Sequence, residues 1–405
     1  MPKNASAIAA PVKGIDAALA IADELADRWR LGAAERDRTR AFPHAEIAEL
    51  KSSGLQALGV PESEGGSGVT FGERCRVLRR IAGVDPSIGQ IFLVHLYWTE
   101  VMNKAAPQEL RSEFNRRITR GELWLGNAAS ELGTRTSVES SLTMSKDGAG
   151  WLLNGKKFYC TASLAADELI VTGSDPATQE HRLAFVPVNT PGLSIIDDWS
   201  GMGQRGTSSG SVEFVNVHVP AARVPDPDSF MGLFESQASM ITVFAQSLLA
   251  SIHVGIATNA LSDTIDYVRS RARPWFQSGV DRASDDPYTL RHIGRMQARL
   301  DATEALQDRA YNLMDDVASA PSEDGRGEAM VAAAKVKLMS TEVGLEICEH
   351  LFQVSGASAT VAKHGLDRHW RNLRTLSLHD PVDYKAKLIG DHAVNRRYPR
   401  VSYYT

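Results

Sequence analysis

The chain has 405 residues, of which 43% are hydrophobic and 23% are charged, and its formal net charge at pH 7 is −5. This length suits two or three domains with a large core, and the mixed charge argues against a surface for nucleic acid or anionic membranes. The cysteines, Cys75, Cys160 and Cys348, lie far apart, which argues against a disulfide framework or a cysteine-built zinc site. We find no signal peptide, and polar residues interrupt the most apolar segment, 241–257, so we expect a cytoplasmic protein with no membrane span and a buried core helix there.

The first 121 residues are predicted to form a helical domain, after a loose leader over residues 1–14. Apolar residues recur at three- and four-residue steps over 15–35, which is typical of one face of a helix. Proline suits the first turn of a helix, and Pro43, Pro86 and Pro107 each fit that position. We therefore expect further helices after Pro43, over 71–82, over 86–105 and after Pro107.

Residues 122–229 are predicted to form a small β-barrel. Asp147-Gly148 and Asn154-Gly155 are typical turn pairs, and the apolar runs between turns are short. The expected strands are 124–127, 141–145, 151–153, 157–160, 168–173, 183–188 and 192–196, followed by one after residue 210.

The stretch from Trp199 to Val219 combines a glycine-rich turn, clustered hydroxyl groups and a strand. Gly201, Gly203 and Gly206 form a G-x-G-x-x-G pattern, but a strand follows it, whereas the dinucleotide fingerprint requires a helix. We assign these glycines to a turn. Val212, Phe214, Asn216 and His218 alternate with their neighbours, so the strand is expected to carry them on one face. Hydroxyl and backbone N–H groups at such a turn suit a planar ligand with polar edges.

Residues 230–405 are predicted to form an antiparallel helical bundle, because long helical patterns follow one another with few breaks. The expected helices cover 234–271, 288–317, 327–353 and 383–395. The fold class is therefore α+β, with an N-terminal helical domain at 1–121, a middle β-barrel domain at 122–229 and a C-terminal four-helix bundle at 230–405.

Several segments resemble the acyl-CoA dehydrogenase superfamily, and together they span nearly the whole chain. They are G-N-A-A-S at 126–130, W-L-L-N-G-K-K-F at 151–158, G-Q-R at 203–205 with V-E-F at 212–214, and R-N-L-R at 371–374. Two further stretches resemble the flavin-dependent monooxygenase branch, which is typified by dibenzothiophene monooxygenase and sulfur-acquisition oxidoreductases. These are A-R-P-W at 272–275, continuing to D-P-Y-T at 286–289, and W-R-N-L-R-T-L-S-L-H-D-P-V-D-Y at 370–384.

The resemblance implies a homotetramer that holds flavin between the β-domain and the bundle. It implies reduced FMN delivered by a separate NAD(P)H:flavin reductase, reaction with O₂ through a flavin C4a-hydroperoxide, and a small apolar organosulfur substrate. FAD stays an open alternative. Where dehydrogenases carry Phe-Gly, this chain has Pro274-Trp275, which favours FMN.

Carried onto this chain, the resemblance implies a set of site residues. The catalytic candidates are His379, His95, Thr161 and Asn127, and the candidate flavin ligands are Asn127, Thr161, Trp199, Ser209, Arg273, Arg371 and Asn372. Arg273 would reach the flavin phosphate from a neighbouring subunit, since a guanidinium binds phosphate through two donors. The alternatives for these residues are ordinary ones: a turn serine, a strand-end threonine, a core tryptophan or a solvated arginine.

Two histidines are candidates because an imidazole exchanges protons near neutral pH. His379 lies in the H-D-P motif shared with the related monooxygenases, and His95 lies in an apolar helix. Either could instead be a structural histidine, bonded within the bundle or satisfied within the core.

Other functions remain open from the sequence. An acyl-CoA dehydrogenase-like enzyme would use Asp380, nine residues after Arg371, although an aspartate is shorter than the glutamate that many dehydrogenases use. Asp380 could also cap the last helix or orient His379. An N- or aromatic C-hydroxylase, or a non-catalytic flavin-binding protein, would share the fold. His364 and His369 lack nearby cysteine or paired carboxylate ligands, so we expect no metal site. The loops 131–140 and 277–286 are expected to shape the pocket.

Overall fold

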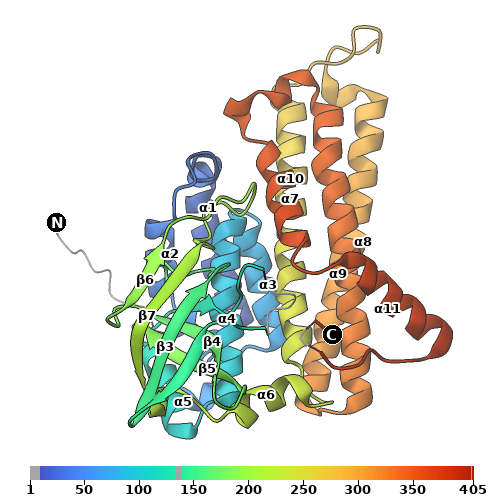
Figure 1. The fold of residues 1–405 in the computed structure, drawn as a ribbon. Coiled ribbons are helices and arrows are strands. Elements are labelled where there is room, and N and C mark those ends of the chain that lie inside the picture. The colour runs from blue at the N-terminus through green and yellow to red at the C-terminus, as the bar shows by residue number, and fades with distance from the viewer. Residues whose placement is uncertain (1–9, 134–138, 403) are drawn as a thin grey trace.

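The computed structural model describes residues 10–133, 139–402 and 404–405, so most of the predicted leader lies outside the described residues. Its order is helices, then a sheet, then helices (Figure 1), as the sequence pattern predicted. The N-terminal helices lie against one side of the sheet, and the long bundle helices stand beside both.

The N-terminal helices begin where the sequence offers caps. Thr70 and Glu73 form a reciprocal capping box at α3, and Asp85 accepts hydrogen bonds from the first amides of α4, with Pro86 in its first turn. The helices are α1 (Ile15–Thr39), α2 (His44–Ser52), α3 (Phe71–Ala82), α4 (Pro86–Ala105) and α5 (Gln108–Thr119), with the short 3₁₀ helices η1 (Leu55–Ala57) and η2 (Glu62–Glu64).

The middle of the chain forms one curled seven-stranded sheet. Its strands follow the order β1-β4-β2-β3-β7-β6, and β5 pairs with β4 beside this path. The pair β1–β4 is parallel, so the turn after β1 lies at the same edge as the end of β4. The strands are β1 (Leu125–Ala128), β2 (Thr143–Asp147), β3 (Gly150–Lys157), β4 (Glu168–Ser174), β5 (His181–Pro187), β6 (Leu193–Ile196) and β7 (Ser211–Pro220).

Two of the predictions for this sheet are wrong because β3 contains a β-bulge. Asn154-Gly155 is not a hairpin turn: it lies inside β3, where the pairing with β7 shifts between Leu153 and Gly155. Opposite it, Asn216 has a positive φ of 53°, and its N–H donates to Asn154 Oδ1 at 2.8 Å. The alternation therefore changes phase, so that Val217 is buried instead of its neighbour His218. The strand expected over 157–160 is also wrong, since β3 ends at Lys157.

The C-terminal helices differ from the prediction in two places. The single helix expected over 234–271 is two helices separated by extended backbone at Ser236, and the helix α10 was not predicted. The helices are α6 (Pro227–Glu235), α7 (Ile241–Ser270), α8 (Pro287–Ser319), α9 (Glu323–Ser355), α10 (Asp367–Ser377) and α11 (Val382–Asn395), with 3₁₀ helices η3 (Ala221–Arg223), η4 (Ala283–Asp285), η5 (Ala357–Thr360) and η6 (Ala362–His364).

Helix α7 is the central helix of the molecule, and it packs against α3, α4, α8, α9 and α10. It is long and apolar enough to cross a membrane, but 89% of its most apolar window is buried inside the protein. The prediction of a core helix is therefore confirmed. The helical parts share one apolar core, whereas the outer side of the sheet has a core of its own.

Candidate active site

Three buried hydroxyl groups meet where the glycine-rich turn leads into β7. Thr161 Oγ1 lies 2.8 Å from Ser209 Oγ, which lies 2.7 Å from Thr207 Oγ1. Thr207 in turn donates to the carbonyl of Gln204 at 2.8 Å. All three side chains are almost fully buried, and they satisfy one another. We call Asn127, Thr161, Trp199, Thr207 and Ser209 the β-domain wall.

Asn127 joins this wall through the backbone. Its N–H donates to the Thr161 carbonyl at 3.1 Å, and its side-chain oxygen accepts from Trp98 Nε1 at 3.2 Å. Its side-chain nitrogen donates to the carbonyl of Tyr159 at 3.4 Å. The structure therefore brings together Asn127, Thr161 and Ser209, three of the predicted site residues, from three separate segments of the chain.

The backbone beside the wall is unusual. Tyr159, Ala162, Gln204 and Ser208 all have φ between 52° and 67°, in the left-handed region that side chains rarely adopt. Such conformations cost free energy, and they concentrate at functional sites. Tyr159 was not predicted as a site residue, and nothing in its sequence context signals this conformation.

Trp199 and the turn after it are held against α10. Trp199 Nε1 donates to the Gln204 carbonyl at 2.9 Å, and the N–H of Gln204 donates to Asn372 Oδ1 at 2.6 Å. A Cβ on Gly203 would lie 2.1 Å from the Arg371 carbonyl oxygen, so only glycine fits this close approach. Asn372, a predicted flavin ligand, is buried and here fixes the turn.

Arg371 is bound within the chain. Its guanidinium lies 2.5 Å from Asp37 on α1 and 2.7 Å from Asp367, and it donates to the Met202 carbonyl at 2.9 Å. Burial opposes its charge, but the bonds to Asp37 and Asp367 outweigh burial and raise its pKa. As placed, Arg371 joins α1, α10 and the turn, and a phosphate would have to displace two carboxylates to reach it.

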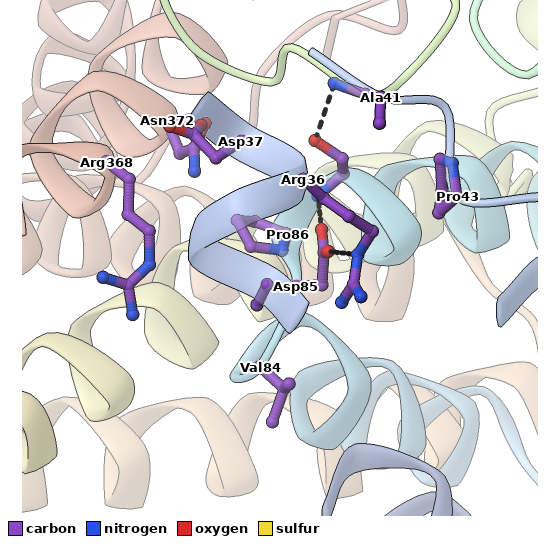
Figure 2. A pocket seen from close by; sticks show the side chains of 12 residues that line it. Arg36, Asp37, Ala41, Pro43, Val84, Asp85, Pro86, Arg368 and Asn372 are labelled. Carbon is purple, nitrogen blue, oxygen red and sulfur yellow. Dashed lines mark hydrogen bonds and ion pairs between the residues drawn. The ribbon is translucent and has the colours of Figure 1, made fainter. Parts of the chain in front are cut away.

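A small cavity of about 10 Å³ lies behind the turn, where α1, α4 and α10 meet (Figure 2). Asp85 on its rim accepts from Arg36 Nε at 2.9 Å, and burial raises the pKa of this carboxyl despite that partner. The N–H of Gly206 donates to Ser87 Oγ at 3.3 Å. The cavity has room for only about one water molecule, so we interpret the residues around it as a packed contact between α1, α4 and α10 that supports the glycine-rich turn.

His379 lies in the loop between α10 and α11, and its imidazole is 52% exposed. Its Nδ1 is 3.8 Å from Oδ1 of Asp380, which is itself buried between two lysines. Burial opposes ionisation of Asp380, but His379, Lys337 and Lys385 outweigh burial and lower its pKa far below the ordinary value. Nothing in the structure shows His379 touching the β-domain wall, and its catalytic role stays a prediction.

His95 is fully buried beneath the wall. Its Nδ1 accepts from the Leu125 N–H at 3.2 Å, its Nε2 lies 2.8 Å from the Gln56 carbonyl, and its ring stacks on Trp124 at 4.2 Å. Burial lowers its pKa to about 4. Both ring nitrogens are thus occupied by backbone groups. This geometry favours the structural alternative, in which His95 supports β1 and through it Asn127.

Arg273 lies in the long loop after α7, which extends beyond the end of the bundle (Figure 1). Its side chain is exposed, and no hydrogen bond or ion pair joins it to another described residue. Trp275 and Phe276 beside it are 65% and 79% exposed. Arg273 is thus available to a ligand or to another copy of the chain.

The first of the two loops expected to shape the pocket, 131–140, is only partly described, because residues 134–138 lie outside the described residues, whereas the second, 277–286, is fully described and contains η4. The described ends of the first loop are fixed. Glu131 Oε1 lies 2.6 Å from the buried Lys157 Nζ and accepts from Ser140 at 2.7 Å. Burial opposes ionisation of Glu131, but the bonds from Lys157 and the neighbouring serines lower its pKa to about 2.

Sequence reasoning missed the lysines that surround Asp380. Lys337 lies on the buried stripe of α9 together with Met330, Ala334, Ser340 and Gly344, and it is fully buried. A lysine at an apolar position of a helix is a signal that could have found it, since a buried ammonium needs a partner.

Models of the acyl-CoA dehydrogenase N-terminal, middle and C-terminal domains match residues 18–122, 126–217 and 247–384. The chain therefore belongs to the acyl-CoA dehydrogenase family. Within the family it is similar to monooxygenases: dibenzothiophene monooxygenase from Rhodococcus qingshengii is 36% identical over 392 residues, covering 94% of each chain. A probable FMNH₂-dependent monooxygenase, SfnC, from Pseudomonas putida is 36% identical over 395 residues, covering 96% of this chain and 97% of the relative.

Among solved structures, FMN-bound TdsC from Paenibacillus sp. A11-2 superposes with a TM-score of 0.90 at 30% identity, covering 96% of this chain and 100% of that one. The predicted family resemblance and the predicted fold class are confirmed. The predicted domain limits and the roles of the individual site residues stay predictions.

Proposed function

We propose that this chain is the oxygenase of a two-component, FMNH₂-dependent monooxygenase that acts on a small apolar organosulfur compound in the cytoplasm. A separate NAD(P)H:flavin reductase would supply the reduced FMN. For a sulfide R₂S, the balance is FMNH₂ + O₂ + R₂S → FMN + R₂SO + H₂O. The similarity to a dibenzothiophene monooxygenase and to an FMNH₂-dependent relative supports both the flavin and the sulfur substrate.

The observation that carries this proposal is the state of Asp380. A dehydrogenase needs a carboxylate that can take a proton from its substrate. Asp380 is instead buried, lies 2.9 Å from Lys385 and 3.4 Å from Lys337, and has a pKa far below its ordinary value. A carboxylate held in this way is a weak base, whereas the His379 imidazole beside it is half exposed.

The β-domain wall fits the ring of a flavin. It offers hydroxyl and amide oxygens that can accept hydrogen bonds, a large flat side chain at Trp199, and a backbone in left-handed conformations beside them. Arg371 is not free to bind a phosphate, because it is paired with Asp37 and Asp367. Arg273, exposed and without a described partner, is the residue that we assign to the phosphate.

When bound, reduced FMN supplies the two electrons that activate O₂. In this proposal Thr161 and Ser209 bond the polar edge of the ring, Asn127 orients it, and Trp199 lies along it. His379 donates a hydrogen bond or a proton from Nε2, the ring nitrogen on the side away from Asp380.

We also propose that the active form is a homotetramer in which Arg273 completes the site of a neighbouring subunit. The exposed Trp275 and Phe276 beside it support an interface at this end of the bundle. Mixing two variants of low expected activity, Arg273→Ala and His379→Ala, tests this. Some mixed oligomers would contain one intact site and regain activity, whereas no recovery on subunit exchange would place Arg273 in its own subunit's site.

The decisive experiment follows the flavin and the product together. FMN is reduced anaerobically with the protein, oxygen is admitted, and the return of the oxidised-flavin absorbance is followed by stopped flow with dibenzothiophene and with an aromatic nitrogen heterocycle as substrates. We expect reoxidation to be slower than for free reduced FMN, and ¹⁸O from O₂ to appear in the sulfoxide. Reoxidation identical with and without protein would refute the proposal, and flavin reduction by an acyl-CoA would establish the dehydrogenase instead.

His379→Ala gives a second test. It should bind FMN normally and lose about a hundredfold or more in product formation, which is the usual contribution of a general acid. Unchanged turnover would remove His379 from the mechanism.

A further inference from the structure

A group of charged side chains is buried beneath the loop that carries His379. Asp380 Oδ2 lies 2.9 Å from Nζ of Lys385 on α11, and Asp380 Oδ1 lies 3.4 Å from Nζ of Lys337 on α9. The three side chains are at most 3% exposed. The same Oδ1 lies 3.8 Å from Nδ1 of His379, so the exposed imidazole stands at the rim of a buried charge cluster.

His253 on α7 extends this cluster into the centre of the bundle. Its Nδ1 lies 3.3 Å from the hydroxyl groups of Ser340 and Thr341. Both hydroxyls donate to the Lys337 carbonyl, so Nδ1 of His253 must carry the proton and donate to them. Its Nε2 is buried and forms no hydrogen bond to a described residue. Burial and the charge of Lys337 keep the pKa of this imidazole well below its ordinary value.

Burying these charged side chains costs folding free energy. Burial lowers the pKa of Lys337, which shows that the environment disfavours its charge, and the nearby Asp380 only partly offsets this. Well-packed apolar side chains of similar volume usually serve stability as well as a buried ion pair does, or better. Stability alone therefore gives no reason for two lysines and an aspartate here.

The cluster also ties three remote parts of the chain to the loop. Lys337 comes from the middle of α9, and Lys385 comes from the first turns of α11 and donates to the Tyr404 carbonyl at 2.6 Å. Asp380 stands between them and directly follows His379. The position of His379 is thereby fixed by α9, by α11 and by the C-terminal residues at once.

We propose that Asp380 is a positioning residue for His379: Lys337 and Lys385 fix the carboxylate, and the carboxylate holds the Nδ1 side of the imidazole so that Nε2 faces the reacting atoms. This inference rests on the proposed monooxygenase function. It assigns Asp380 the role of positioning His379, whereas a dehydrogenase would require Asp380 to abstract a proton from the substrate.

A double-mutant cycle tests it. Asp380→Asn keeps the shape and removes the charge, and the matched control is Asp383→Asn, an exposed carboxylate in the first turn of α11. We expect Asp380→Asn to bind FMN like the wild type but to form product about ten- to a hundredfold more slowly, releasing hydrogen peroxide instead. In the His379→Gln background the same change should have no further effect, because Asp380 acts through His379. Equal losses in both backgrounds would overturn the proposal.

A second measurement needs neither flavin nor turnover. In the flavin-free protein, the rate at which diethyl pyrocarbonate modifies His379 is followed by peptide mass spectrometry. Removing the carboxylate frees Nδ1, so the rate should rise at least twofold in Asp380→Asn and stay unchanged in Asp383→Asn. An unchanged rate in both would show that Asp380 does not hold the imidazole. If the wild type forms no product while this rate still changes, the proposed function fails and the positioning role stands.

Asp380→Asn leaves two buried lysines without their carboxylate and could fold poorly. Lys385→Met removes one lysine and leaves Asp380 paired with Lys337, so one buried positive charge remains with one buried negative charge. It should fold, show the same rise in His379 modification, and lose product formation in the same direction but to a smaller extent. Wild-type behaviour of Lys385→Met in both measurements would contradict the proposed fixation of the carboxylate.

Discussion

The hydroxyl groups of the β-domain wall are buried and neutral, whereas the imidazole of His379 is half exposed and stands over buried charges. In the wall, Thr161, Ser209 and Thr207 satisfy one another at distances of 2.7 to 2.8 Å. Around His379, Asp380 lies between two lysines that come from different helices. The two regions thus serve different roles in the proposed function. The wall would bind the polar ring of the flavin, and the charged cluster would fix the imidazole that holds a proton.

This difference explains how each region is stabilised. Removing one partner of a neutral buried hydrogen bond leaves the other unsatisfied and costs about 1–3 kcal/mol. Removing one partner of a buried ion pair costs about 3–5 kcal/mol, because it leaves an uncompensated charge. We therefore expect substitutions in the wall to cause small losses of flavin affinity. Substitutions in the charged cluster should cause larger losses of product formation or of folding stability.

The largest effect is expected where the glycine-rich turn of the wall contacts α10, at Gly203. In Gly203→Ala the new Cβ would lie 2.1 Å from the Arg371 carbonyl oxygen and would push the turn away from α10. We expect a loss of about 2–3 kcal/mol in stability, as for other overpacked sites, and a loss of most FMN affinity. Urea unfolding and titration of FMN fluorescence measure the two. Gly390→Ala on α11, where nothing lies within 4 Å, is the control: it should bind FMN as the wild type does and should not lose stability, since alanine favours a helix by about 0.5–1 kcal/mol over glycine.

The pH dependence of folding stability tests whether His95, which lies below the wall, is neutral in the folded protein. Burial lowers the pKa of His95 to about 4 from an ordinary value of 6.5, so between these values the unfolded chain binds a proton that the folded chain does not. Stability should therefore be constant above pH 7 and fall as the pH drops from 6.5 to 4, by on the order of 2–3 kcal/mol. Urea midpoints across this range measure the effect.

The control for this pH dependence is His95→Gln, which cannot be protonated. It should flatten part of the slope but not all of it, because burial also lowers the pKa of His369 to about 4. A variant with the full wild-type slope would show that His95 is protonated in the folded protein, and would reopen a catalytic role for it.

Substitution of Asp37 tests whether Arg371 is a structural cation or a phosphate ligand. In Asp37→Asn its strongest partner is lost, and we expect about 1–2 kcal/mol of destabilisation with FMN affinity changed less than twofold. If Arg371 bound the phosphate, freeing it from Asp37 would instead strengthen FMN binding. Glu35→Gln, at an exposed position of the same helix, is the matched control for removing one negative charge.

Much of the wall could be predicted from the sequence because its parts are local. The turn glycines, the hydroxyls at 207–209 and the strand that follows are adjacent in the chain, and family motifs mark Asn127 and Thr161. The bulge in β3 could not be predicted, since Asn-Gly is typical of a turn and only the pairing with Asn216 reveals the alternative.

The charged cluster was harder, because its members come from separate helices. Nothing near Asp380 in the sequence indicates that Lys337 on α9 lies 3.4 Å away, and Arg371 and Asp37 pair across 334 residues. A motif can predict which residue type stands at a position. It cannot predict which partner has already taken that side chain, and for Arg371 and Asp380 the partner decides the chemistry.

The smallest expected effect separates the hydroxyl of Thr161 from its shape. Thr161→Val keeps the side-chain volume but leaves Ser209 with Thr207 as its remaining partner. We expect a loss of about 1 kcal/mol, or roughly fivefold in FMN affinity, with folding unchanged. Thr161→Ser should restore the affinity because it returns the hydroxyl. If both variants bind FMN as the wild type does but Thr161→Val loses product formation, the hydroxyl acts on the reaction and not on binding, and the wall would share the chemical role that we assign to His379.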